Sequence, residues 1–134
     1  MRLLLDSHVF VWVKSSPENL SNEARARIID PENDVFISVA SAWELWLKHA
    51  KKPIAGFAPV LDSGGRGFLN AARESGIALL EITLDHTAAS AALARIHSDP
   101  VDRMLIAQAI VEKLTLMTAD TVFKRYKGLH VLAA

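Results

Sequence analysis

Short apolar segments alternate with helix-like segments along this chain, and this alternation constrains its fold more than any other feature. Five short, mostly apolar runs are predicted strands, the last only a possible one: 2–5, 35–38, 78–82, 114–118 and 130–132. Strands that are apolar on both faces and separated by helices are typical of a parallel sheet covered on its two sides. The sequence therefore predicts an α/β protein with α/β/α layers around a mainly parallel sheet of four to five strands.

The segments between these strands carry helix patterns. We expect helices at about 7–13, 22–29, 40–51, 68–74, 86–95, 100–113 and 121–126. The start at Asp99-Pro100 is well marked, because a capping aspartate precedes a proline at the first helical position. Ser7 is the expected cap of the first helix. The Gly- and Pro-rich stretch 53–67 is predicted to be a loop with a weak helix start.

Composition narrows the class of protein. At 134 residues the chain has the length of a single domain, 1–134, and 51% hydrophobic residues argue against disorder. Fifteen basic and fifteen acidic residues give zero net charge, which disfavours a protein that coats polyanions. No run is long enough to span a bilayer and no signal peptide is recognisable, so a cytoplasmic location without membrane contact is expected. Without cysteine there is no thiolate chemistry.

Four acidic residues are placed at one edge of the predicted sheet. Asp6 closes the first strand, Glu44 lies about one turn into the helix after the second, Asp102 lies in the first turn of the helix opened by Asp99, and Asp120 follows the fourth strand. Ligands of open parallel sheets bind beyond the carboxyl ends of the strands. We therefore expect these carboxylates, which come from distant segments, to meet there.

Clustered carboxylates repel one another unless they take up protons or a cation compensates them. An all-oxygen ligand set fits a hard cation, Mg²⁺ or Mn²⁺. Such ions can activate water and stabilise the oxyanions of a phosphodiester. Basic residues flank the predicted cluster, and Lys48 and Arg103 are candidates for contact with substrate phosphates.

Four motifs together resemble the PIN-domain ribonucleases, and most closely the VapC-type toxins of toxin–antitoxin pairs. They are Leu4-Leu5-Asp6-Ser7-His8, the segment 38–44 (SVASAWE), the segment 97–103 (HSDPVDR) and Thr118-Ala119-Asp120. Each motif alone is weak, but the four occur in order over essentially the whole chain. The resemblance implies a PIN-like fold and a Mg²⁺- or Mn²⁺-dependent endoribonuclease that cuts RNA, commonly tRNA or rRNA, and so inhibits translation.

The resemblance also implies partners and roles. Such toxins form homodimers, are inhibited by a cognate antitoxin, and reach operator DNA only through that antitoxin. The family's catalytic, metal-binding quartet maps by position onto Asp6, Glu44, Asp102 and Asp120, with Asp99 as a further acid. The sequence departs from the family at Ser7, where threonine is more usual, and in the Gly/Pro-rich 53–67, where relatives often carry partner contacts.

Structural roles are open for several of these residues. Asp6 and Asp99 are both suited to capping helices, and for Asp99 capping is the favoured role. Trp43 and Trp46 are expected in the core or a dimer face rather than as platforms for bases. Arg103 is expected to pair with a neighbouring acid, with phosphate as the alternative. His8 and His97 lie near the predicted site.

Three functions remain in competition. The first is the metal-dependent endoribonuclease, in which Ser7 and Thr118 are candidates to hydrogen-bond a carboxylate or a metal-bound water. The second is a phosphotransfer or receiver-like α/β domain with Asp6 as phosphate acceptor, which lacks the expected paired aspartates and late lysine. The third is a non-catalytic binding module whose acids are structural. A metal-dependent rise in thermal stability separates the first from the third.

Overall fold

The computed structural model describes all 134 residues. Its centre is a five-stranded sheet with the strand order β3-β2-β1-β4-β5, and every neighbouring pair is parallel. The strands are β1 (Arg2–Leu5), β2 (Asp34–Ser38), β3 (Ile77–Leu80), β4 (Thr115–Thr118) and β5 (His130–Ala133). The prediction of a parallel sheet, with its possible fifth strand, is confirmed.

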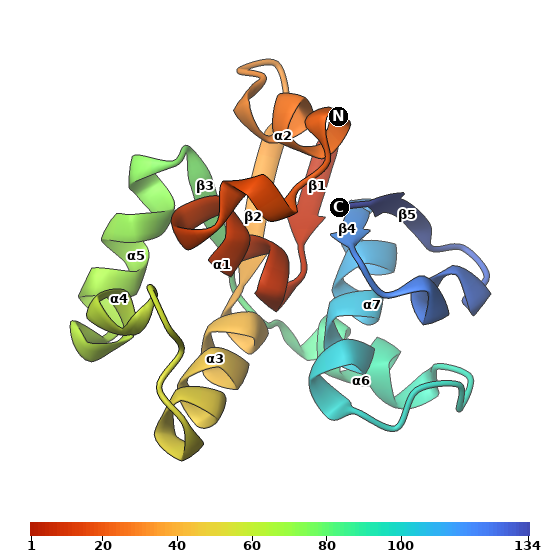
Figure 1. Cartoon of the computed structure of the whole chain (residues 1–134). Helices are drawn as coiled ribbons and strands as arrows, with labels where there is room; N and C mark the ends of the chain where they lie inside the picture. Colours follow the sequence, from red (N-terminus) through yellow and green to blue (C-terminus); the bar gives the residue numbers. More distant parts are fainter.

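Seven α-helices connect and cover these strands, as Figure 1 shows. They are α1 (Ser7–Ser15), α2 (Asn22–Ile29), α3 (Val39–Lys51), α4 (Ala58–Asp62), α5 (Gly64–Glu74), α6 (Leu84–Ala92) and α7 (Pro100–Glu112). Two 3₁₀ helices, η1 (Pro17–Asn19) and η2 (Thr121–Arg125), complete the chain. None of the helices has both the length and the apolar character needed to span a bilayer.

The two faces of the sheet bury separate apolar clusters. Leu3 and Leu5 belong to a cluster that includes side chains of α1, α2, α4 and α5, whereas Leu4 belongs to one built largely on α7 and η2. This division follows from the pleat, because successive side chains of a strand point to opposite faces. All three leucines are fully buried. The strands are therefore apolar on both sides, and the α/β/α layering is confirmed.

The strand order places the reversal of the chain at β1. From β1 the chain moves outward to β2 and β3, then returns to the other side for β4 and β5. The crevice beyond the carboxyl ends of β1 and β4 is therefore the switch point, where open α/β sheets bind ligands. Asp6 follows β1 directly, and Asp120 follows β4 after one intervening residue. Beyond the neighbouring β2, α3 extends away from the sheet (Figure 1).

The structure corrects the prediction for 53–67. This stretch contains α4, and α5 begins at Gly64 rather than at Phe68. Pro59 lies in the first turn of α4, where a missing backbone N–H costs nothing. Gly64 adopts a left-handed φ of 71° where the chain turns from one helix into the next. At Gly67 an added Cβ would lie only 2.2 Å from the Cβ of Ser63, the residue that joins the two helices, so this tight connection needs glycine.

Candidate metal centre

Asp6 is the most firmly held carboxylate at the switch point. Its Oδ1 accepts the backbone N–H of Ser7 at 2.7 Å, and its Oδ2 accepts the hydroxyl of Thr118 at 2.7 Å. Its own backbone N–H donates to the carbonyl of Met117 at 3.0 Å, which continues the pairing of β1 with β4. Asp6 caps α1, so the expectation of Ser7 as the cap is wrong. Because Asp6 is only 4% exposed, these contacts fix its position.

A second group of carboxylates lies where α3 meets the start of α7. One oxygen from each of Glu44, Asp99 and Asp102 lies within 4.8 Å of the other two. Asp99 caps α7 by accepting the backbone N–H groups of Val101 at 2.8 Å and of Asp102 at 3.2 Å. The predicted capping role of Asp99 is confirmed, and the same side chain also belongs to the carboxylate group.

The two groups of acids influence one another through Asp102. Burial raises the pKa of Asp102 from 3.8 to about 7 and is the largest cause. The remaining causes are the negative charges of four carboxylates, which are, in decreasing order, Asp99, Asp6, Glu44 and Asp120. The expectation that acids from four distant segments meet at one edge of the sheet is therefore confirmed.

Asp120 joins this arrangement through Thr118. The hydroxyl of Thr118 donates to Asp6 and accepts the backbone N–H of Asp120 at 3.0 Å. The carboxylate of Asp120 accepts the N–H of Val122 at 2.9 Å and so caps η2, the short helix expected at 121–126, which is a 3₁₀ helix. Asp120 lies outside the compact group of Glu44, Asp99 and Asp102. Thr118 thus sets the relative position of two acids that follow adjacent strands.

Two hydroxyl groups near these acids have no hydrogen-bond partner. Ser7 Oγ and Ser41 Oγ are both buried and unpaired. Ser7 adjoins Asp6 at the start of α1, and Ser41 lies in the first turn of α3, one helical turn before Glu44. The contact of Ser7 with Asp6 uses its backbone N–H and leaves the hydroxyl free. A buried polar group without a partner is costly, which fits a site that receives a polar ligand.

The donor set of this site suits a hard divalent cation. It consists of carboxylate oxygens, with hydroxyls nearby and no sulfur, as Mg²⁺ and Mn²⁺ prefer. The clustered carboxylates also require compensation: burial raises the pKa of Asp102, and the charges of the four neighbouring carboxylates raise it further. The residues present therefore fit such an ion.

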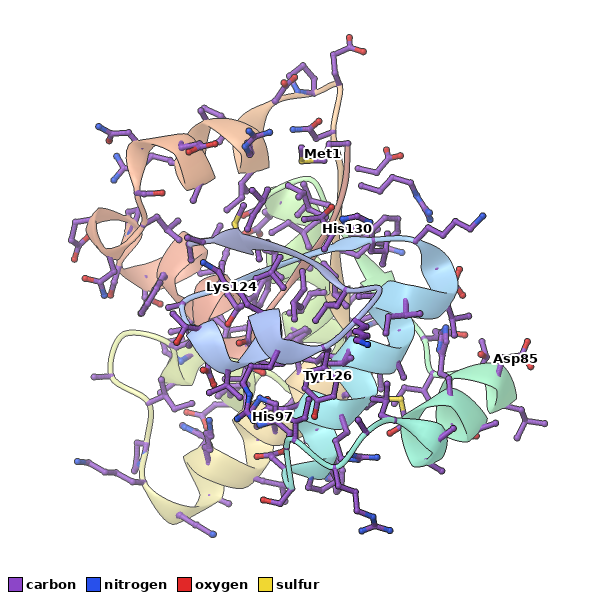
Figure 2. The ribbon with its side chains drawn as sticks, turned by 90° about the vertical axis from the view of Figure 1, so that its right-hand side faces the viewer. Met1, Asp85, His97, Lys124, Tyr126 and His130 are labelled. Carbon is purple, nitrogen blue, oxygen red and sulfur yellow. The ribbon has the colours of Figure 1, made fainter.

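Two histidines border the site. His97 Nδ1 lies 3.8 Å from Asp102 Oδ2, and His8 Nδ1 lies 3.6 Å from Asp6 Oδ2. The His97 ring stacks on Tyr126 with an interplanar angle of 6°, and its backbone N–H donates to the Tyr126 hydroxyl at 2.7 Å (Figure 2). Its Nε2 is buried without a partner. The neighbourhood of both histidines to the acids, expected from the sequence, is confirmed.

The basic residues singled out in the sequence differ in their surroundings. Lys48 is exposed, and its ammonium group lies 3.4 Å from Glu44 Oε1. The expectation that Arg103 pairs with an acid is wrong, because its guanidinium donates to the carbonyls of Ser90, Leu93, Ala94 and His97. These four bonds occupy the side chain in holding the segment before α7. Of Lys48 and Arg103, the two candidates from the sequence, we therefore retain Lys48 for contact with phosphate.

The two tryptophans of α3 also differ. Trp46 is half-buried, and its indole N–H donates to the carbonyl of Leu61 at 3.0 Å, which ties α3 to α4. Trp43 is 56% exposed, so a place in the core is wrong for it. The other expectation for Trp43, a dimer face, requires such a surface position and stays a prediction. Trp43 and Leu47 stand four residues apart and so share one face of the helix.

A parallel α/β sheet with carboxylates gathered at its switch point defines an α/β protein with an acidic site suited to a cation. Residues 3–129 match the family model of the PIN domain, and the chain belongs to the PIN-domain family. PIN domains are generally nucleases and generally use divalent metal ions. No curated protein sequence matches the chain.

Several solved structures share this fold. One is VapBC2 from Rickettsia felis bound to a promoter DNA fragment, with a TM-score of 0.71, 20% identity, and coverage of 99% of this chain and 98% of the other. Another is DNA-bound VapBC from Salmonella typhimurium, with a TM-score of 0.68, 17% identity, and coverage of 99% of this chain and 98% of the other. A third is FitAcB from Neisseria gonorrhoeae, with a TM-score of 0.62, 20% identity, and coverage of 97% of this chain and 96% of the other. At these identities the likeness establishes the fold.

Proposed function

We propose that this protein is a divalent-metal-dependent endoribonuclease, with Mg²⁺ as the cofactor and Mn²⁺ as its substitute. The observation that carries the proposal is the compact group of Glu44, Asp99 and Asp102 oxygens, with Asp6 and Asp120 close enough to raise the pKa of Asp102. Membership of a family of nucleases supports phosphodiester cleavage over the receiver-like and non-catalytic alternatives.

In this proposal Asp6, Glu44, Asp102 and Asp120 hold the metal, with Asp99 contributing both a charge and the cap of α7. When bound, the ion supplies the positive charge that offsets the acids and activates water toward a phosphodiester. Thr118 fixes the orientation of Asp6, as outer hydrogen bonds do for metal-binding carboxylates.

In this proposal the Ser7 hydroxyl and the Lys48 ammonium group contact the attacking water and the substrate. The unpaired Ser7 hydroxyl is available to hydrogen-bond a water beside Asp6, and it can both donate and accept. The exposed ammonium group of Lys48 is available to a phosphate of the substrate. Acids that hold a cation, with a lysine at the rim, allow the site to meet RNA at one point despite zero net charge.

The nuclease proposal is tested with purified protein and in vitro transcribed tRNA. We expect cutting with Mg²⁺ or Mn²⁺, none with EDTA, and a loss of at least two orders of magnitude in Asp6→Asn and Asp102→Asn. Asparagine keeps the shape of either side chain, and thermal melting verifies folding. The matched control is Glu32→Gln, an exposed carboxylate in the turn before β2. Cutting that persists in EDTA or in both variants contradicts the proposal.

We further propose that the enzyme is the toxin of a toxin–antitoxin pair, cutting tRNA or rRNA in the cytoplasm and acting as a homodimer. This proposal is supported by the structures of the same fold, which include a "Toxin-antitoxin complex from Klebsiella pneumoniae" and VapBC structures with DNA. Contact with operator DNA then occurs only through the antitoxin.

The toxin role is tested in cells. Induction of the chain alone should arrest growth and translation, and sequencing of RNA ends should reveal a small set of cut sites. Co-expression of the short neighbouring reading frame should restore growth, and light scattering should give twice the chain mass. Normal growth during induction of soluble, metal-competent protein refutes the toxin role and leaves the nuclease proposal standing.

A further inference from the structure

Helix α3 presents a tryptophan to solvent beside the carboxylate group. The side chain of Trp43 is 56% exposed and that of Leu47 is 49% exposed. Because residues four positions apart are neighbours on a helix, the two form one apolar strip. Exposed large aromatic side chains of this kind mark binding surfaces more often than isolated aliphatic ones do.

This strip forms one wall of a hollow of about 260 Å³, and the start of α7 forms the opposite wall with Pro100 and Val101. The hollow also contains Glu44 and Asp99, two of the three carboxylates in the candidate metal centre. It is therefore continuous with that centre. Its volume lies below the roughly 300–1,000 Å³ of pockets that enclose whole drug-sized ligands, so it suits one flat ring system.

Two lysines line the same hollow. Lys48 and Lys51 follow the apolar strip along α3, and both side chains are exposed. The single ion pair of Lys48, with Glu44 at 3.4 Å, is a weak surface contact that a phosphate can replace. An aromatic face, a carboxylate of the candidate metal centre and two cationic groups of α3 thus line the same hollow.

We propose that this hollow is a nucleotide subsite, in which an unpaired base next to the scissile phosphate stacks on the indole of Trp43. Lys48 and Lys51 then hold the neighbouring backbone phosphates. This inference rests on the proposed ribonuclease function and adds where the flanking nucleotide binds. Single-stranded RNA is commonly held by stacking on aromatic side chains within a cationic groove, which accepts any base.

The charge pattern favours RNA over a second copy of the chain on this face. The cores of protein–protein interfaces are depleted of charged residues. Here the two exposed apolar residues are interleaved with Glu44, Lys48 and Lys51, so burial against protein would desolvate three charges for two apolar contacts. A nucleotide, in contrast, supplies a ring for the indole and an anion for the lysines.

Binding is measured with a fluorescently labelled, single-stranded 12-nucleotide RNA of mixed sequence in Mg²⁺. All variants carry Asp6→Asn so that the RNA stays intact. We expect Trp43→Ala to weaken binding about 5- to 140-fold, the range that stacking of one base corresponds to. Trp43→Phe should retain most of the affinity. Trp46→Phe is the matched control, since Trp46 lies on the same helix but is half-buried, and it should bind normally.

Intrinsic fluorescence provides an independent readout. Bound RNA should quench tryptophan emission in the parent and in Trp46→Phe, but not in Trp43→Phe. An RNA of the same length made of abasic nucleotides should bind the parent and Trp43→Ala equally, because the phosphates remain while the base is gone. Lys51→Ala should lower the salt dependence of binding for both kinds of RNA.

Unchanged RNA affinity in Trp43→Ala, with quenching intact in Trp43→Phe, overturns the subsite. The same holds if Trp43→Ala alters only the mass measured by light scattering, because the face is then a contact between copies. Failure of the wild-type protein, which carries Asp6, to cut RNA with metal refutes the proposed function instead. The two failures are distinguishable because the binding measurements use protein that cannot cut.

Discussion

The hydroxyl of Thr118 donates a 2.7 Å hydrogen bond to Oδ2 of Asp6, joining two residues 112 positions apart in the sequence. The hydroxyl oxygen of Thr118 also accepts the backbone N–H of Asp120 at 3.0 Å. Thr118 is 2% exposed, so water does not substitute for either contact. One buried hydroxyl thereby connects the acids that follow β1 and β4.

Replacement of Thr118 by valine, which has the same shape, should therefore affect both stability and metal binding. We expect the free energy of unfolding in urea to fall by about 1–3 kcal/mol, because Asp6 and Asp120 each lose a buried partner. The affinity for Mg²⁺, measured from the rise in melting temperature on titration, should fall about 10- to 100-fold. Thr118→Ser keeps the hydroxyl and should behave like the wild type. Equal Mg²⁺ affinity in the valine and serine variants argues against the positioning role.

The pKa of Asp102 leads to a prediction for the metal-free protein. In the folded state the carboxyl group holds its proton up to about pH 7, whereas in the unfolded chain it ionises near pH 3.8. Between these values the folded state binds more protons, so the contribution of Asp102 to the free energy of unfolding falls as the pH rises. Urea titrations in EDTA from pH 4 to pH 8 should reveal this fall when the wild type is compared with Asp102→Asn.

Asp102→Asn has no carboxyl group to ionise and removes one charge from the cluster. The variant should be more stable than the wild type in EDTA at pH 8, with the difference vanishing toward pH 4. In Mg²⁺ the order should reverse, because only the wild type has the full set of metal-binding carboxylates. A wild type that gains stability relative to Asp102→Asn as the pH rises in EDTA contradicts a raised pKa.

The sequence predicts the sheet and the gathering of acids well because both follow from local patterns. Apolar runs separated by capped helices define a parallel sheet, and the topology of such a sheet brings its strand ends together. Asp6, Asp102 and Asp120 adjoin strand ends or a marked helix start, so their shared location follows without any knowledge of distances.

Features set by tertiary packing are not visible in the sequence in this way. Glycine has a low helix propensity, yet α5 starts at Gly64. The burial of Phe68 and the close approach of Gly67 to Ser63 outweigh this low propensity. The carbonyl partners of Arg103 come from the end of α6 and the loop after it, whose path no local pattern encodes. The exposure of Trp43 likewise depends on which neighbours α3 acquires.

Arg103 should hold the segment 93–99, which leads into α7, in place through hydrogen bonds. Its Nη2 donates to the carbonyls of Ser90 at 2.8 Å and Leu93 at 3.1 Å, while Nη1 donates to those of Ala94 and His97.

Lysine at position 103 keeps the charge but not the planar fork of donors. We expect Arg103→Lys to increase proteolytic cutting within 93–99 several-fold, as located by mass spectrometry. Arg95→Lys, an exposed position in the same segment, should leave the pattern unchanged. Proteolytic cutting within 93–99 that is equal in Arg103→Lys and the wild type argues against this role of Arg103.

His86 should stabilise the start of α6 and its packing on α7 through its two hydrogen bonds. The residue is fully buried, and its Nδ1 accepts the backbone N–H of Thr83 at 3.0 Å, completing the capping box of α6. With Nδ1 as acceptor, the proton lies on Nε2, which donates to Glu112 Oε1 at 2.9 Å.

Replacement of His86 by leucine removes both contacts and leaves the Thr83 N–H without a partner. We expect the free energy of unfolding in urea to fall by about 1–3 kcal/mol. His86→Gln should recover part of this loss, because glutamine at the third helical position also reaches back to the N–H of the capping residue. The comparison isolates hydrogen bonding from burial, since both variants fill similar space. If His86→Leu is as stable as His86→Gln, the contribution of His86 lies in packing and not in the capping box.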